Sequence, residues 1–187
     1  MSWSNAEAKH SHEYTCGWCG NLVASAIGYG SKVRHSEDIF ICPHCQNPTI
    51  FVGIKQVPGV EFGTSVKHLP PDVEALYGEA RQCAAAACYT ASVLICRKLL
   101  MNVAVAQGAA TGQTFIAYVE HLANGGYVPP NGRGWVDHIR KKGNEATHEI
   151  VLMSSVEAEE LISFSEMLLK FIYEFPSRIP QVPAGAP

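Results

Sequence analysis

The sequence lacks an excess of positive charge, because its 14 lysine and arginine residues are outnumbered by 17 aspartate and glutamate residues. A net charge of −3 gives no overall attraction to nucleic acid, so any contact with a polyanion must be local. The first 13 residues are polar and contain no secretory hydrophobic segment. The longest apolar stretch, around residues 83–106, is interrupted by Arg97 and Lys98 and fits a buried helix better than a membrane span. These absences predict a cytoplasmic protein with no membrane partner.

Two Cys-x-x-Cys pairs are the strongest motif that the sequence does contain; their members are Cys16, Cys19, Cys42 and Cys45. Two residues between paired cysteines let one tight turn direct both sulfurs at the same ion, and four thiolates are a frequent ligand set of structural zinc. Short strands are expected on either side of the second pair, at residues 38–42 and 48–52. The pattern predicts a Zn²⁺ ribbon with no open coordination position and therefore no hydrolytic role for the metal.

Other interpretations of these cysteines exist. The two pairs are also compatible with two disulfides, but the polar N-terminal residues give no sign of the oxidising compartment that disulfides require. His12 and His44 are alternative ligands, although a histidine inside the Cys-x-x-Cys turn would require a different turn. The remaining cysteines, Cys83, Cys88 and Cys96, lie in helical sequence rich in alanine and leucine and are interpreted as small buried residues.

After a short connector, apolar residues recur at helical spacing. Helices are expected over residues 71–86, 87–107, 113–124 and 135–142, and a last one from the capping box of Ser154 and Glu157 to Pro176. We therefore predict a mainly α protein, in which an antiparallel helical bundle over residues 67–176 follows a small β zinc ribbon over residues 13–58. Residues 1–12 are expected to be a flexible N-terminus, and residues 177–187 a disordered proline-rich tail.

One segment combines basic and titratable side chains. The cluster Arg140, Lys141 and Lys142 directly precedes Asn144 and His148, which share one face if the chain is helical there. A histidine beside a cation can move a proton from an RNA 2′-hydroxyl while the cation holds the phosphate, without a metal. The alternative is structural: the intervening glycine ends a helix, and His148 bonds a backbone carbonyl within the bundle.

Several short segments occur in an order that resembles a known family. They are His68-Leu-Pro-Pro71, Tyr77-Gly-Glu-Ala80, residues 91–97, Gly126-Tyr-Val-Pro129, Ile139-Arg140 and residues 143–148. Their order resembles the HEPN-like bacterial domain of unknown function that ends in an Arg, Gly-Asn-x-x-x-His segment and often follows a small zinc-binding module. The resemblance covers residues 67–176 and implies an HEPN-like bundle. It also implies an accessory role in restriction and phage defence, and homodimers, because the wider superfamily contains dimeric RNases and RNA-binding bundles.

Two positions depart from the pattern of active HEPN RNases. Gly143 stands where the catalytic arginine is expected, so Arg140 or Arg97 would have to take its place. Met101 stands where the family would have an acidic residue four positions after Arg97. A structural alternative for Arg97 is a partly buried arginine that pairs with a loop or a neighbouring subunit.

Together these features predict a zinc-binding HEPN-like accessory protein. Its expected ligand is nucleic acid, RNA first and DNA as the alternative, held by Arg140, Lys141 and Lys142. The other expected partner is a nuclease in bacterial defence against phage or foreign DNA. One alternative is a metal-independent endoribonuclease that acts as a dimer, with His148 as acid or base, Arg140 or Arg97 on the phosphate, and Asn144 orienting them. The other is a purely structural dimerisation or adaptor subunit.

Overall fold

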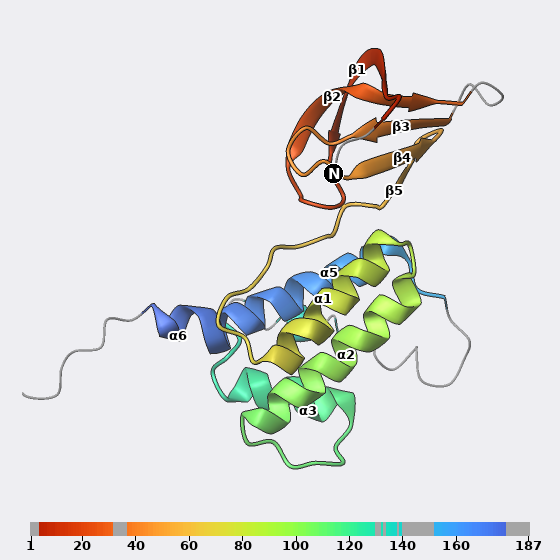
Figure 1. Ribbon diagram of the computed structural model, residues 1–187. Coiled ribbons are helices and arrows are strands. Elements are labelled where there is room, and N and C mark those ends of the chain that lie inside the picture. Colours follow the sequence, from red (N-terminus) through yellow and green to blue (C-terminus); the bar gives the residue numbers. More distant parts are fainter. Residues whose placement is uncertain are drawn as a thin grey trace, which may run out of the picture. The chain divides into compact units, whose positions relative to one another are not determined.

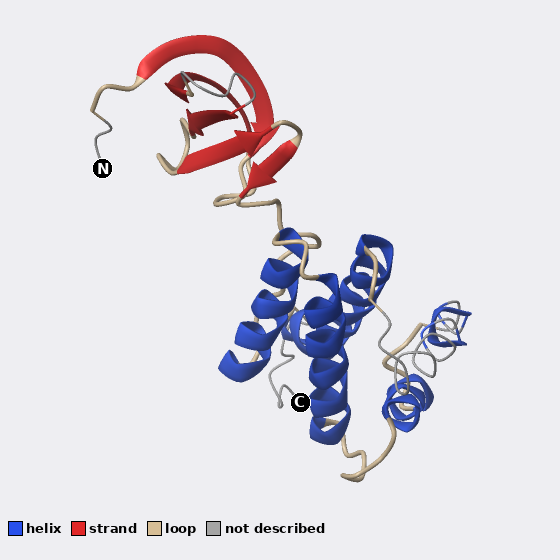
Figure 2. Ribbon diagram, turned by 90° about the vertical axis from the view of Figure 1, so that its right-hand side faces the viewer, coloured by secondary structure: helices blue, strands red, loops and turns tan. Residues whose placement is uncertain are grey.

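The computed structural model describes residues 4–31, 37–129, 132, 134–137, 139 and 152–178. The chain divides into two compact units, Met1–Glu61 and Phe62–Pro187. All the strands in the described part of the chain belong to the first unit and all the helices to the second (Figures 1 and 2). The sequence analysis placed the two domains at residues 13–58 and 67–176.

The N-terminal unit is an antiparallel sheet in which each strand pairs with the next along the chain. Its strands are β1 (Glu7–Thr15), β2 (Leu22–Gly30), β3 (Glu37–Ile41), β4 (Pro48–Val52) and β5 (Lys55–Val57). One face carries a small core of Tyr14, Val23 and Phe40 together with Cys16 and Cys42. The ring of Phe51 packs against Tyr14, with 5.2 Å between the ring centroids. A core this small needs another source of stability.

This sheet shows that the predicted mainly α fold is wrong: the protein has a mixed fold, with a five-stranded sheet in one unit and helices in the other. The sequence pattern had indicated the two strands that flank the second cysteine pair, and room for a short hairpin between the two pairs. β1 was missed because it is polar and because its pairing with β2 shifts register between Ala8 and His12, which breaks the simple alternation of a strand. Residues 7–12, expected to be a flexible N-terminus, belong to β1.

The C-terminal unit is helical. Its elements are α1 (Pro71–Ala85), α2 (Tyr89–Ala106), α3 (Phe115–Asn124), α5 (Ser155–Leu169), the π-helix η2 (Lys170–Glu174) and α6 (Phe175–Ser177). α5 begins at the capping box predicted from the sequence, in which Ser154 and Glu157 each bond the other's backbone N–H. Of the helix expected over residues 135–142, residues 135–137 and 139 are described and helical, and the others lie outside the described residues.

The helix α2 lies at the centre of this unit and packs against α1, α3 and α5. Leu99 and Leu100 of α2 are fully buried and meet Leu122 of α3 and Phe164 of α5 in one core. By length and composition α2 is the one helix in the described part of the chain that would suit a membrane span. Its place in the centre of a packed core accounts for the same apolar composition.

The first three helices end in the same hydrogen-bonded turn. After each last turn one residue takes a positive φ: Ala87 at 60°, Gly108 at 91° and Gly126 at 83°. The next N–H then bonds the carbonyl five residues earlier, for example from Cys88 to Cys83 at 2.8 Å after α1. This is the Schellman motif, which normally has glycine at the left-handed position. α1 is the exception, because it has alanine there.

The last helix does not end at Pro176, as the sequence analysis predicted, but continues as α6 to Ser177. Proline lacks an N–H and its ring clashes with the carbonyl four residues earlier in an α-helix. The chain forms the wider π turn of η2 directly before α6, and that turn relieves the clash.

A charged stripe along α5, η2 and α6 holds the segment that precedes α1. Its members, Glu166, Lys170, Glu174 and Arg178, recur every four residues. The carboxylate of Glu166 accepts bonds from the backbone N–H of Thr64 at 2.9 Å and from its hydroxyl at 2.6 Å. Glu174 accepts a bond from the backbone N–H of Lys67 at 3.1 Å. The stripe therefore fixes the start of the helical unit by hydrogen bonds, in addition to the burial of Val66 in the core.

Candidate metal centre

The sheet topology brings the two Cys-x-x-Cys turns together. β1 and β3 both pair antiparallel with β2, so they run in the same direction and end at the same edge of the sheet. Cys16 follows the last residue of β1, and Cys42 follows the last residue of β3. Two segments far apart in the sequence therefore reach one place because of strand order alone.

The two turns have the same backbone hydrogen bonds. In the first, the N–H of Cys16 donates to the carbonyl of Asn21 at 2.9 Å, and the N–H of Gly20 donates to the carbonyl of Cys16 at 2.8 Å. In the second, Cys42 donates to Asn47 at 3.0 Å and Gln46 donates to Cys42 at 2.9 Å. The fourth residue after the first cysteine is left-handed in both, with a φ of 70° at Gly20 and 61° at Gln46. The repeated turn gives each pair of sulfurs the same orientation.

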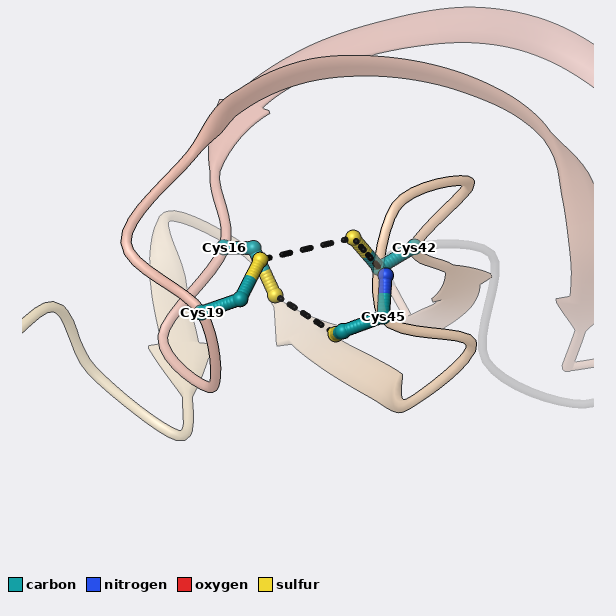
Figure 3. Close-up of side chains that lie close together, drawn as sticks. All are labelled: Cys16, Cys19, Cys42 and Cys45. Atoms are coloured by element: carbon teal, nitrogen blue, oxygen red, sulfur yellow. Dashed lines mark hydrogen bonds between the residues drawn. The ribbon is translucent and has the colours of Figure 1, made fainter.

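The four sulfurs form a compact group (Figure 3), and their ligand atoms all lie within 4.8 Å of one another. The Sγ atoms of Cys16 and Cys45 are 3.8 Å apart, and those of Cys19 and Cys42 are 3.9 Å apart. A disulfide bond would require about 2.05 Å. A tetrahedron with metal–sulfur bonds of about 2.3 Å has sulfur–sulfur edges of about 3.8 Å. The spacing therefore fits four thiolates around one ion and no disulfide.

The surroundings of the sulfurs differ between the two members of each pair. Cys16 and Cys42 are fully buried, and burial raises the pKa of both thiols. Cys19 is partly exposed; burial raises the pKa of its thiol, but hydrogen bonds from the backbone and side chain of Asn21 outweigh this and lower it to about 6. The backbone N–H of Cys45 lies 3.5 Å from the sulfur of Cys42 and points a positive dipole at it. Amide groups of the turns thus favour anionic sulfur, which is the form that binds metals.

The two histidines considered as alternative ligands do not join the group. The Nδ1 atom of His44 accepts a bond from the side-chain amide of Asn21 at 3.1 Å. The ring of His12 stacks on Phe40, with 5.0 Å between centroids, and meets Phe51 edge-on at 4.6 Å. Within the described part of the chain, the group that can hold a metal ion consists of the four cysteines alone.

Some residues that shape the centre gave no clear signal in the sequence. The indole N–H of Trp18, inside the first turn, donates to the carbonyl of Pro48 at 2.7 Å and so ties the two cysteine loops together. A side chain at Gly17 would place its Cβ 2.3 Å from the carbonyl oxygen of Pro58. Glycine is therefore required there by close backbone approach, whereas the motif itself accepts any residue at that position.

The other predicted site residues are placed differently. Arg140, Lys141, Lys142, Asn144 and His148 lie outside the described residues. Arg97 lies on α2 in the helical unit, where its guanidinium sits 4.5 Å from the centroid of the Phe115 ring. Burial lowers the pKa of Arg97. The structure thus assembles the predicted metal ligands and places Arg97 as a half-buried cation stacked on an aromatic ring.

Fold and site define the class of this chain: a β module with four clustered cysteines that could hold a metal ion, followed in sequence by a helical domain. The chain belongs to the family described as domain of unknown function DUF4145, whose model matches residues 78–183. The match begins inside α1, so the four cysteines lie outside it. Comparison with curated proteins and with solved structures gives no match.

Proposed function

We propose that the four cysteines hold one Zn²⁺ ion, which stabilises the N-terminal unit of an accessory binding protein. The observation that carries this proposal is the sulfur spacing of 3.8 and 3.9 Å, which suits four bonds of about 2.3 Å. Soft thiolates in tetrahedral arrangement select zinc or iron among common metals. Zinc needs no particular redox state and is the usual occupant of such ribbons.

The chemistry of a closed site supports binding rather than metal catalysis. Four protein sulfurs fill a tetrahedral ion, so a bound ion has no position for water or substrate. Its effect is on folding, because the aromatic core beneath the cysteines is too small to stabilise the sheet by itself. Structural zinc contributes roughly 10 kcal/mol or more of apparent binding free energy to such modules.

The proposed ligand is RNA, bound by the helical domain through Arg140, Lys141 and Lys142. In the described part of the ribbon the lysines are Lys9, which is paired with Asp38, and Lys55. Phosphate contacts need several free cations, and the described part of the ribbon offers few of them. The resemblance to HEPN-like domains supports the same assignment, together with a cytoplasmic homodimer that acts in bacterial defence against phage.

RNA binding is tested by fluorescence anisotropy with single-stranded RNA over a range of salt concentrations. The logarithm of affinity falls with the logarithm of salt by about 0.7 for each phosphate contact. Changing Arg140, Lys141 and Lys142 together to alanine is expected to weaken binding and to reduce this slope by about 2. Lys55→Ala removes one exposed charge from the ribbon and should leave the slope unchanged. An unchanged slope in the triple variant would refute the assignment.

The enzymatic form of this proposal is an RNase activity of residues 140–148. His148 would act as acid or base, and Asn144 would orient it. Arg140 or Arg97 would bind the phosphate. The half-buried position of Arg97 on Phe115 supports a fixed cation in the helical unit. Zinc-loaded protein is incubated with single-stranded RNA without added metal, beside His148→Ala. Cleavage that disappears in the variant would establish the RNase. Intact RNA in both samples would leave a binding or adaptor protein.

The second candidate function is the binding of a nuclease or another defence protein by the ribbon. Cross-strand pairing aligns Tyr29, Ile39, Ile50 and Val57 in one row on the sheet face opposite the aromatic core. Ile50 is 40% exposed and Val57 is 44% exposed. An apolar row with little charge suits an apolar protein surface better than a polyanion. With a purified nuclease partner, Ile50→Lys should abolish the complex and Lys55→Ala should not; equal binding by both variants would refute this role.

A further inference from the structure

Outside the four-cysteine cluster, two further cysteines, Cys83 and Cys88, flank the turn between α1 and α2. The backbone N–H of Cys88 donates to the carbonyl of Cys83 at 2.8 Å, which is the longer-range bond of the Schellman motif. This motif brings the side chains at these two positions together. At the ends of α2 and α3 the equivalent positions carry apolar pairs, Ala104 with Ala109 and Leu122 with Tyr127. At the end of α1 the equivalent positions carry two thiols.

The two thiols are accessible, contrary to their interpretation as buried residues. Cys88 is exposed and Cys83 is partly exposed, whereas Cys96 on the next helix is fully buried. Burial and the nearby charge of Cys88 both raise the pKa of Cys83, which agrees with close approach of the sulfurs. Only Cys96 among these three cysteines is an inert core residue.

Cys88 also has the better position to react first. It occupies the N-cap of α2, and no side chain there accepts a bond from the N–H groups of the first helical turn. The exposure of Cys88 gives peroxide access to the sulfur, and the reaction of a thiol depends on that access. The Cys88 sulfur lies 3.8 Å from the carbonyl oxygen of Ala86, and Cys83, five residues earlier in the chain, is the second thiol.

We propose that Cys83 and Cys88 form a peroxide-sensitive dithiol that closes to a disulfide across the turn between α1 and α2. The Cys88 thiolate attacks one oxygen of hydrogen peroxide, the O–O bond breaks, and the sulfenic acid and one water are formed. The Cys83 sulfur then attacks the Cys88 sulfur, the S–S bond forms, and the hydroxyl leaves as a second water. Two thiols and one peroxide thus give one disulfide and two waters.

The geometry allows this bond without rearranging the helices. A disulfide requires α-carbons roughly 4.4–6.8 Å apart, and a direct backbone hydrogen bond between the two residues places them in that range. The resulting loop closes within one turn, so α1 and α2 keep their packing. Cellular thiols would reverse the reaction by exchange, which makes the pair a reversible redox site rather than a structural crosslink.

The test is peptide mapping of the zinc-loaded full chain after treatment with equimolar hydrogen peroxide. Trypsin cleaves after Arg81 and Arg97, so one peptide carries Cys83, Cys88 and Cys96. After alkylation of free thiols, we expect that peptide to carry a single alkyl group and to be lighter by two hydrogen atoms, with the alkyl group on Cys96. Dithiothreitol before alkylation should restore three alkyl groups. Zinc release is followed in parallel, and only products formed before zinc leaves are scored.

Three variants decide the assignment. Cys83→Ser and Cys88→Ser should each abolish the disulfide, whereas Cys96→Ala, in the same peptide, should leave it unchanged. A sulfinic acid on Cys88 with Cys83 still alkylated would overturn the proposal, because the second thiol would then be out of reach. A peptide that keeps three alkyl groups after peroxide would overturn it as well.

Discussion

Ala87 and Gln46 hold left-handed backbone positions that glycine holds elsewhere in the same molecule. Ala87 corresponds to Gly108 and Gly126 at the helix ends, and Gln46 corresponds to Gly20 in the cysteine turns. A Cβ atom in this region approaches the next carbonyl oxygen, which costs roughly 1–2 kcal/mol. At Ala87 the packing of the helices offsets that cost. At Gln46 the hydrogen bonds of the paired cysteine turns offset it.

Replacing Ala87 by glycine should therefore stabilise the helical unit. The gain from relieved strain, roughly 1–2 kcal/mol, is reduced by roughly 0.4–1 kcal/mol because glycine makes the unfolded chain more flexible. We expect the free energy of unfolding to rise by about 0.5–1 kcal/mol, measured by denaturant titration. Ala86→Gly makes the same change one residue earlier, at a φ of −83°, and should lower stability. Equal effects of the two variants would contradict the account.

Glycine signals in the sequence located the ends of α2 and α3, because Gly108 and Gly126 stand at the left-handed positions. The same reasoning could not locate the turns at Ala87 and Gln46. At those two positions the conformation is imposed by the hydrogen bonds of the whole turn rather than by the preference of the residue. The backbone hydrogen bond between Cys88 and Cys83 was hidden for the same reason.

At the scale of elements, the segment before α1 is held by polar contacts on α5. Glu166 is the centre of this arrangement: Lys170 and Thr64 both donate to its carboxylate, and the hydroxyl of Tyr77 lies 3.4 Å away. Arg81 of α1 bonds the carbonyls of Phe62 and Gly63 at 2.8 and 2.9 Å. The stability of this corner depends on the ionised state of one carboxylate.

This dependence predicts a pH effect. Burial raises the pKa of Glu166, but the hydrogen bonds from Lys170 and Thr64 and the charge of Lys170 outweigh it, so the folded-state pKa lies below its ordinary value. A depressed folded-state pKa gives stability that is present above the unfolded-state value, about 4.3, and is lost as pH falls through the folded-state value. Below about pH 4 the protein should lose this contribution.

Glu166→Gln tests the effect, because glutamine keeps the size of the side chain and removes its charge. At pH 7 the variant should be less stable by about 2 kcal/mol, the usual contribution of hydrogen bonds to a charged group. The difference from the natural protein should shrink as pH falls below about 4. Glu159→Gln, at an exposed position of α5, is the control and should leave the stability at pH 7 nearly unchanged. A difference that stays constant with pH would show that the carboxylate charge is not responsible.

Periodicity predicted the helices better than the strands. The apolar residues Phe115, Tyr118, Val119 and Leu122 of α3 are all buried, as their spacing indicated, because one face of that helix enters the core. β1 and β2 could not be found in this way. β1 is polar and irregular, and β2 contains alanine and glycine, so their pairing depends on the neighbouring strands rather than on their own composition. The error in fold class came from these two strands.

At the scale of the whole molecule, the four-cysteine cluster and the family match belong to different units. The model of the DUF4145 family begins at residue 78, so it describes the helical domain alone. The cysteine site was predicted from spacing because a Cys-x-x-Cys turn fixes its own geometry. Arg97 carries no such local constraint, and its place on Phe115 depends on how α2 packs against α3.

Because the two units have separate cores, metal removal should affect them unequally. A strong chelator is expected to unfold the sheet, since loss of roughly 10 kcal/mol or more of metal-binding free energy exceeds what a small aromatic core supplies. The helical unit should keep its structure. Circular dichroism and amide NMR should therefore show loss of strand signals with helix signals unchanged. Simultaneous unfolding of both units would contradict this independence.

The most direct test of the central claim is X-ray absorption at the zinc edge, with the metal content of the purified protein measured on the same sample. The account predicts one zinc per chain, surrounded by four sulfur atoms at about 2.3 Å. A first shell that contains nitrogen or oxygen would contradict the closed thiolate site, and so would a chain that binds no zinc.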